Sequence, residues 1–288
     1  MPLKDMLVCF DRTTAGYARL DLAFNLAAAS GAHLVGAYVL PEAQASPAES
    51  IGFGLAPPAG MTGLMEEGAS GALRAAEAAE SVERHFNSRL RLHNIEGKWH
   101  QLVDGDTAPL IELAKSVDLT IAGQRPPNSQ SDGASRFRPE DIVLATGRPV
   151  LIVPYVGTFE TVGKRIPIAW DRTREANRAL NDALPVLTEA QAVSVIYVAS
   201  QARELEQHWL ALERMVSQLR RHGIAANLED TLRGDTAVSD ILLSRAADLA
   251  ADLIVSGCYH HSQLRGALLG GVSHDLLARM TVPVMMSH

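Results

Sequence analysis

The chain has 288 residues, enough for one large domain or two of about 140. Its formal net charge of −7 argues against a broad surface for nucleic acid or for anionic membrane. Its two cysteines are too far apart in sequence to suggest a disulfide framework or a metal site. With neither a secretory leader nor an apolar run of about 20 residues, we expect a cytoplasmic protein that does not interact with membranes.

The first half begins with a short apolar run, predicted to be a strand, that ends in Asp11-Arg12-Thr13. The segment Pro41–Gly71 is rich in Gly, Pro, Ala and Ser, which predicts a loop or lid and not a strand or long helix. A Val-Asp-Gly-Asp-Thr motif at Val103–Thr107 then precedes a helical run. The apolar runs Val117–Gly123 and Gly147–Val153 complete this half as predicted strands.

The second half alternates predicted strands with amphipathic helices. Thr173 suits the N-cap of its first helix, Pro185 should kink or tighten that helix near its end, and Gly223 should end the second helix. The predicted strands are Arg165–Trp170, Ala192–Val198, Asn227–Leu232, Asp252–Ser256 and Pro283–Met286, and the last predicted helix is Ser273–Met280.

The same motifs occur in the same order in both halves, which indicates an internal repeat. Asp-Arg-Thr recurs at Asp171–Thr173, and Gly-Asp-Thr recurs at Gly234–Thr236. We therefore predict two domains, residues 1–155 and 163–288, with an insertion at about 41–71 in the first.

Alternating strands and helices with short connections predict an α/β fold made of two doubly wound domains, each with a five-stranded parallel sheet in the order 3-2-1-4-5. In such folds ligands bind beyond the carboxyl ends of the strands, where the strand order reverses. In the second domain this switch point lies between strands one and four. It is flanked by Asp171-Arg172-Thr173 and by the segment that starts at Gly257.

The polar residues beside the switch point suit a nucleotide but also have simpler explanations. Asp11 and Asp171 could accept hydrogen bonds from an adenine amino group or a ribose hydroxyl, and they could equally cap the following turn. Gly270, Gly271 and Ser273 could form a phosphate cradle at a helix N-terminus, or the glycines could only permit a tight loop.

Basic side chains and histidines near the same strand ends are less specific indications of a phosphate site or a metal site. Arg172 and Arg265 could contact phosphates, although surface arginines seldom have so specific a role. His260 and its neighbours match no zinc spacing, so no protein metal site is predicted. The sequence contains no phosphate-binding P-loop, no G-x-G-x-x-G after a first strand and no nucleophile elbow, and we predict no catalytic residue.

In each half of the chain these features resemble the universal stress protein family, and the two matches together cover nearly the whole chain. The family pattern is an Asp at the end of strand one and G-x2-G-x9-G-[ST] after strand four. Gly257 and Gly270 match the outer glycines, whereas His260 stands at the second glycine and Gly271 at the Ser/Thr, with Ser273 two residues later. Nucleotide-binding members also use a backbone group at the end of strand two, which corresponds to Val198 here.

The resemblance implies that the second domain binds ATP or another adenine nucleotide, with Mg²⁺ accompanying ATP and with little or no hydrolysis. The residues predicted to contact the nucleotide are Asp171, Arg172, Thr173, Val198, Gly257, His260, Arg265, Gly270, Gly271, Val272 and Ser273. The function that this implies is that of a stress-response regulatory protein.

The first domain departs further from the family pattern. Pro126 stands at the second glycine, and Arg136 and Phe137 stand where Gly270 and Gly271 do. Because phenylalanine fills space that glycine leaves open, we predict that this domain does not bind ATP in the family's manner. The weaker candidate residues of the first domain are Asp11, Thr13, Val39 and Gly123.

Two alternative functions stay open at this stage: a scaffold that binds partners without a nucleotide, and a binder of a small apolar ligand with the 41–71 segment as its lid. The fifth strands of this family pair across a two-fold axis. Val150–Val153 and Val284–Met286 could thus pair within one chain as a pseudo-dimer. The sequence leaves open whether two chains associate further into a homodimer.

Overall fold

The computed structural model describes residues 3–40, 62–103, 107–126, 137–258 and 270–288, with only the backbone described at 62–75. The strands are β1 (Asp5–Phe10), β2 (His33–Leu40), β3 (Gly97–Val103), β4 (Leu119–Gly123), β5 (Val150–Val153), β6 (Arg165–Ala169), β7 (Ala192–Ala199), β8 (Ala226–Leu232), β9 (Ile254–Gly257) and β10 (Val284–Ser287). The helices are α1 (Thr14–Ser30), α2 (Thr62–His93), α3 (Thr107–Lys115), α4 (Pro139–Thr146), α5 (Arg174–Leu187), α6 (Ala202–Arg221), α7 (Val238–Asp248) and α8 (Gly271–Arg279).

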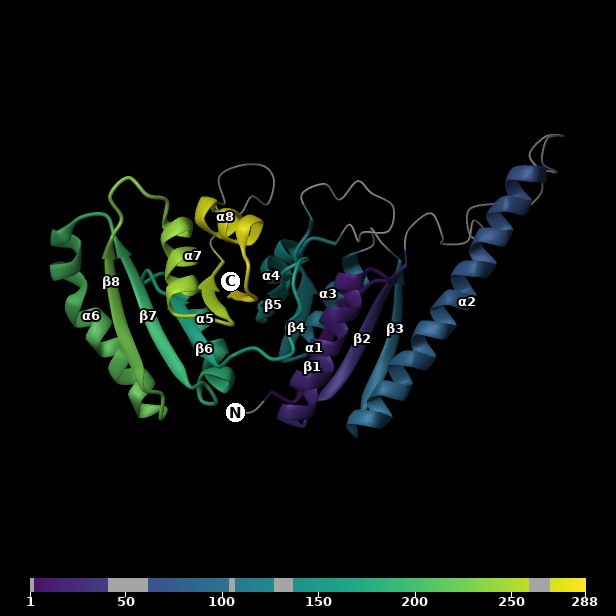
Figure 1. The fold of residues 1–288 in the computed structure, drawn as a ribbon, viewed down its shortest axis with the longest axis horizontal. Helices are drawn as coiled ribbons and strands as arrows, with labels where there is room; N and C mark the ends of the chain where they lie inside the picture. The colour runs from purple at the N-terminus through teal and green to yellow at the C-terminus, as the bar shows by residue number, and fades with distance from the viewer. Residues whose placement is uncertain (1–2, 41–61, 104–106, 127–136, 259–269) are drawn as a thin grey trace.

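The strands form one ten-stranded sheet in the order β3-β2-β1-β4-β5-β10-β9-β6-β7-β8 (Figure 1). Each half is a parallel sheet in the order 3-2-1-4-5, which confirms the predicted fold class. The halves join where β5 and β10 pair antiparallel, with Val284 opposite Ile152 and Met286 opposite Val150. The two sheets therefore continue into each other within a single chain.

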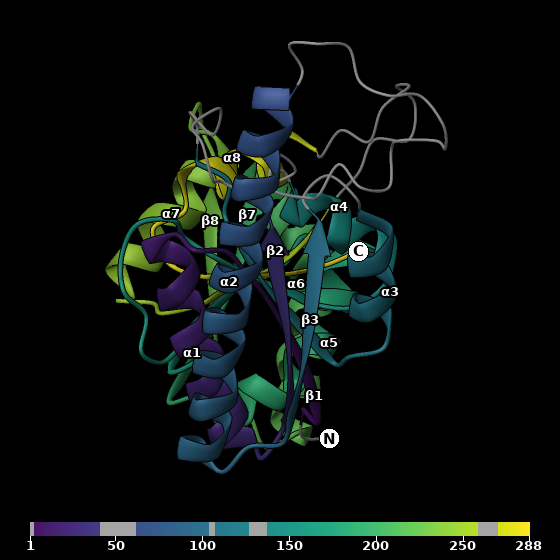
Figure 2. The ribbon, with the colours of Figure 1, turned by 90° about the vertical axis from the view of Figure 1, so that its right-hand side faces the viewer.

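Helices cover both faces of the sheet, and each face has its own core. Buried residues of α1, α2, α5 and α6 pack on one face, and those of α3, α4, α7 and α8 pack on the other. Figure 2 shows the first half of this arrangement, with α1 and α2 on one side of the sheet and α3 and α4 on the other. The strands serve both cores because successive side chains point to opposite faces: Phe10 belongs to the first core and Cys9 to the second.

Thr13 and Thr173 start the first helix of each half in the same way. The side chain of Thr13 accepts a hydrogen bond from the N–H of Gly16, and that of Thr173 accepts one from the N–H of Ala176. Thr173 is thus the predicted N-cap. Gly223 follows α6 with a φ of 79°, a conformation that favours glycine and ends the helix as predicted.

The Pro41–Gly71 prediction is wrong where it can be compared with the structure. Residues 41–61 lie outside the described part of the chain, but residues 62–71 form the start of α2 and not a loop. Glycine-rich sequence disfavours a helix, yet adding turns to an existing helix is easy once it has been nucleated, and the run after residue 71 supplies that helix. Although α2 is 32 residues long, neither it nor any other described helix is long and apolar enough to cross a membrane.

Replacing Thr173 with alanine should lower the free energy of unfolding by about 1 kcal/mol, because the first turn of α5 loses its side-chain cap. Urea denaturation followed by circular dichroism measures this change. Thr188→Ala is a matched control at the other end of α5, where the hydroxyl donates to the carbonyl of Pro185. Equal, negligible losses in both variants would contradict the capping role of Thr173.

Candidate functional site

The second half has a cavity of about 290 Å³ at its switch point, between the carboxyl ends of β6 and β9 and the N-terminus of α8. Arg172 does not line this cavity; its guanidinium lies 2.7 Å from a ring nitrogen of His208 on α6. His260 and Arg265 lie outside the described residues. The predicted residues that do line the cavity are Asp171, Thr173, Val198, Gly257, Gly270, Gly271, Val272 and Ser273.

Asp171 holds the turn that leads into α5. Its Oδ1 accepts hydrogen bonds from the N–H of Thr173 at 3.0 Å and from the hydroxyl of Thr173 at 2.6 Å. This is the capping role that the sequence left open for this residue. Since no described residue donates to Oδ2, the second carboxylate oxygen of this exposed side chain can still accept a hydrogen bond from a ligand.

The space that a side chain would fill is occupied at Gly257 and open at Gly271. A Cβ at Gly257 would lie 2.5 Å from the backbone nitrogen of Ala176, so the missing side chain admits the first turn of α5. Among the described residues, a Cβ at Gly271 would have no atom within 4 Å. Gly257 therefore serves helix–strand packing, whereas Gly271 keeps the space in front of α8 open.

Glu175 lines the same cavity and was not among the predicted site residues. It lies in the first turn of α5, its side chain is only 7% exposed, and it pairs with Arg174. Burial alone would raise the pKa of Glu175, but hydrogen bonds from Arg174 and the backbone, with the charges of Arg174 and His288, outweigh burial and lower the pKa. The cavity wall thus carries a negative charge at neutral pH.

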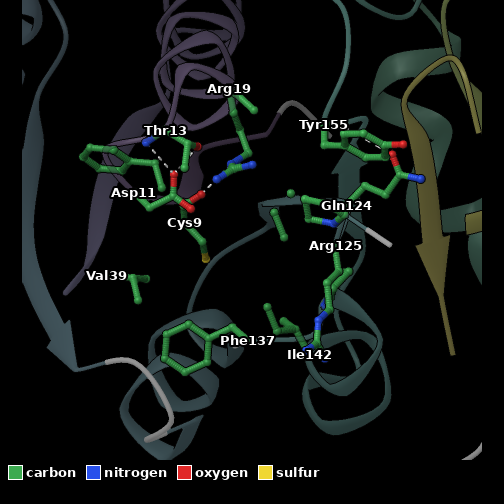
Figure 3. Close-up of a pocket in the computed structure, with 16 residues that line it drawn as sticks. Cys9, Asp11, Thr13, Arg19, Val39, Gln124, Arg125, Phe137, Ile142 and Tyr155 are labelled. Carbon is green, nitrogen blue, oxygen red and sulfur yellow. Dashed lines mark hydrogen bonds between the residues drawn. The ribbon is translucent and has the colours of Figure 1, made fainter. Parts of the chain in front are cut away.

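The first half has a smaller cavity, of about 150 Å³, at its own switch point (Figure 3). Asp11, Thr13, Val39 and Gly123, the weaker candidates, all line it. Phe137, which the sequence predicts to fill space, is 9% exposed and also lies in the wall. The first switch point is therefore reduced in size but still open.

The feature of this cavity that sequence reasoning missed is Arg19 on α1. Its Nε donates to the carbonyl of Cys9 at 2.6 Å, and its guanidinium occupies the place where a Cβ on Gly123 would lie. The equivalent residue of the second half is Ala179, which is buried on α5. Comparing the two copies could have found this residue, because an arginine stands on a helix face that is apolar in the other copy.

The largest of the cavities described, about 670 Å³, lies at the opposite edge of the sheet. Residues of both halves line it, among them Met6, Leu119 and Leu253, which lie at or just before the amino ends of β1, β4 and β9. Because parallel sheets of this type bind ligands at the carboxyl ends of their strands, the two switch points are the better candidate sites.

Cys9 and Cys258 should be unreactive in the folded protein. Both are buried, and burial raises the pKa of each thiol to about 12, so that the reactive thiolate is scarce at neutral pH. We expect a disulfide reagent at pH 8 to modify neither thiol in the native protein and both in urea. Rapid labelling of the native protein would contradict the burial of these residues.

The fold and the two switch points define a class: tandem doubly wound α/β domains with a ligand-sized cavity beyond the central strands of each. Residues 163–288 match the model of the universal stress protein family. The second half therefore belongs to the universal stress protein family. The first half repeats the fold of the second, so the chain is two domains of one fold in tandem.

Solved structures show the same architecture over the whole chain. A universal stress protein from Archaeoglobus fulgidus is 15% identical with a TM-score of 0.69, and the match covers 98% of this chain and 97% of that one. A candidate universal stress protein from Pseudomonas aeruginosa is also 15% identical, with a TM-score of 0.62 and coverage of 99% and 93%. At this identity the likeness establishes the fold alone. No curated protein matches the sequence.

Proposed function

We propose that this protein is a stress-response regulatory protein that binds an adenine nucleotide in its second domain and turns it over slowly or not at all. The observation that carries the proposal is the 290 Å³ cavity between Asp171 and the N-terminus of α8, with open space at Gly271. The free backbone N–H groups at a helix N-terminus favour a phosphate. The free Oδ2 of Asp171 favours an amino or hydroxyl group of adenosine, and the backbone at Val198 is the second polar contact for adenine.

The charge of the cavity favours a nucleotide with few phosphates. Glu175 is anionic in the wall, so it repels the tri-anionic or tetra-anionic tail of ATP more than the phosphate of AMP. The described residues contain no group of three His, Cys, Asp or Glu side chains that could hold a metal ion. Mg²⁺ would thus enter together with ATP, and it would reduce the repulsion by Glu175.

Titration calorimetry with AMP, ADP and ATP, each with and without Mg²⁺, tests the proposal. We expect AMP to bind more tightly than Mg²⁺-free ATP, and Mg²⁺ to help ATP but not AMP. Gly271→Ala should weaken binding by about tenfold with no loss of stability, because the added methyl group meets none of the described residues and lies in the space proposed for the ligand.

Asp141→Ala is the matched control, since Asp141 lies in the first turn of α4, the helix of the first domain that corresponds to α8. This variant should bind nucleotide like the wild type. An absence of heat with all three nucleotides would reject the proposal and would favour the scaffold alternative.

A further inference from the structure

Arg19 is a buried cation whose charge the described part of the chain leaves largely unpaired. Its residue is 7% exposed, and only its Nε has a hydrogen-bond partner among the described residues, the carbonyl of Cys9. Among the described residues Asp11 forms no ion pair with it, although the charge of Asp11 favours the charged form of Arg19. Oδ1 of Asp11 accepts from the backbone N–H and the hydroxyl of Thr13. The two terminal nitrogens of the guanidinium are thus left facing the cavity at the first switch point (Figure 3).

An unpaired buried guanidinium is energetically unfavourable, and a ligand with a matching negative charge relieves this penalty. The two terminal nitrogens present a planar fork that fits the two oxygens of a carboxylate, in a hydrogen-bonding geometry stronger than that of a neutral pair. Burial lowers the pKa of Arg19, and the negative charge of Asp11 offsets only part of this decrease. An arginine side chain nevertheless keeps its proton at neutral pH.

The rest of the cavity wall is suited to an apolar group and not to a highly hydrated ion. Val39 on β2, Phe137 just before α4 and Ile142 on α4 face the same space as the guanidinium. The cavity volume of about 150 Å³ is that of a pocket that holds one benzene-sized molecule. The guanidinium of Arg19 takes up the space over Gly123.

From these observations we propose that the first switch point binds a small organic carboxylate about the size of benzoate, with its carboxylate on Arg19 and its apolar body against Val39, Phe137 and Ile142. The second domain has Ala179 in place of Arg19, so this specificity belongs to the first domain alone. The proposal does not depend on the nucleotide, since the two cavities share no lining residue.

Benzoate and inorganic phosphate are the probes that test it, with binding followed by the amide NMR signals of Gly123 and Gln124 in the full chain. We expect benzoate to shift these signals saturably while those of Gly271 and Ser273 stay unchanged. Arg19→Met, which keeps most of the side-chain volume, should weaken benzoate binding by about tenfold or more. Gly271→Ala, which alters only the second cavity, should bind benzoate like the wild type.

If Arg19→Met fails to fold, Ile142→Phe provides a second variant, because it fills the cavity from α4 and leaves the charge in place. It should abolish the benzoate shifts. Equal benzoate binding by wild type and Arg19→Met, phosphate binding without benzoate binding, or saturable shifts at Ser273 instead of Gly123 would each overturn the proposal.

Discussion

Replacing Gly257 with alanine is expected to lower the free energy of unfolding by about 3 kcal/mol. The new methyl carbon would lie 2.5 Å from the nitrogen of Ala176 and 2.7 Å from the carbonyl carbon of Glu175. These are backbone atoms in the first turn of α5, so the clash cannot be relieved by a change of rotamer. Either α5 shifts away from β9, or the end of β9 shifts away from the rest of the sheet.

Denaturation in urea, monitored by circular dichroism, measures the effect of this substitution against two controls. Gly271→Ala should change stability by less than about 0.5 kcal/mol, because its Cβ meets no atom of the described residues within 4 Å. Gly123→Ala should fall between the two, since its Cβ would meet the flexible end of Arg19 and not backbone. Equal losses at Gly257 and Gly271 would contradict the different roles assigned to these glycines.

The second large effect is expected at the junction of the two halves. Ile152→Asp places a carboxylate at a fully buried position of β5 opposite Val284 of β10, and we expect a loss of about 4 kcal/mol or more. Since the sheet continues from β5 into β10, the damage should destabilise both domains and not only the first. Differential scanning calorimetry should show a lower transition temperature for the whole molecule.

Val156→Asp is the control for this substitution, because Val156 follows β5 closely but is 68% exposed. Its transition should stay within about 1 °C of the wild type, as expected for a surface change. A calorimetric trace in which Ile152→Asp leaves a second transition at the wild-type temperature would show that the domains unfold independently.

Much of the fold could be predicted because its determinants are local or repeated. The period of the apolar residues indicates strands or helices, and two copies of the same motif order indicate two domains of one topology. In such a topology the strand ends converge, so Asp171 and Gly271, about 100 residues apart in sequence, line one cavity. Thr173 and Gly223 could be assigned for the same reason, since capping depends on the residue and its near neighbours.

The rest of the site depends on tertiary neighbours that no local pattern reveals. Gly257 was predicted to contact the nucleotide, and it lines the cavity, but the first turn of α5 takes the place of its missing side chain. Arg19 and Glu175 lie on helices whose orientation toward the cavity is set by packing on the sheet. The two copies differ by a few exchanges, Arg19 for Ala179 and Phe137 for Gly271, and the cavity of the first copy is smaller and more cationic than that of the second.

Photolabelling with 8-azido-AMP followed by peptide mass spectrometry tests the central claim most directly, because it reports which switch point holds the adenosine. We predict that the label attaches to peptides of the second cavity, from residues 171–173, 198 or 271–273, and that unmodified AMP displaces it. Labelling that AMP does not displace, or that falls on the first cavity at residues 11–19 or 137–142, would contradict the assignment.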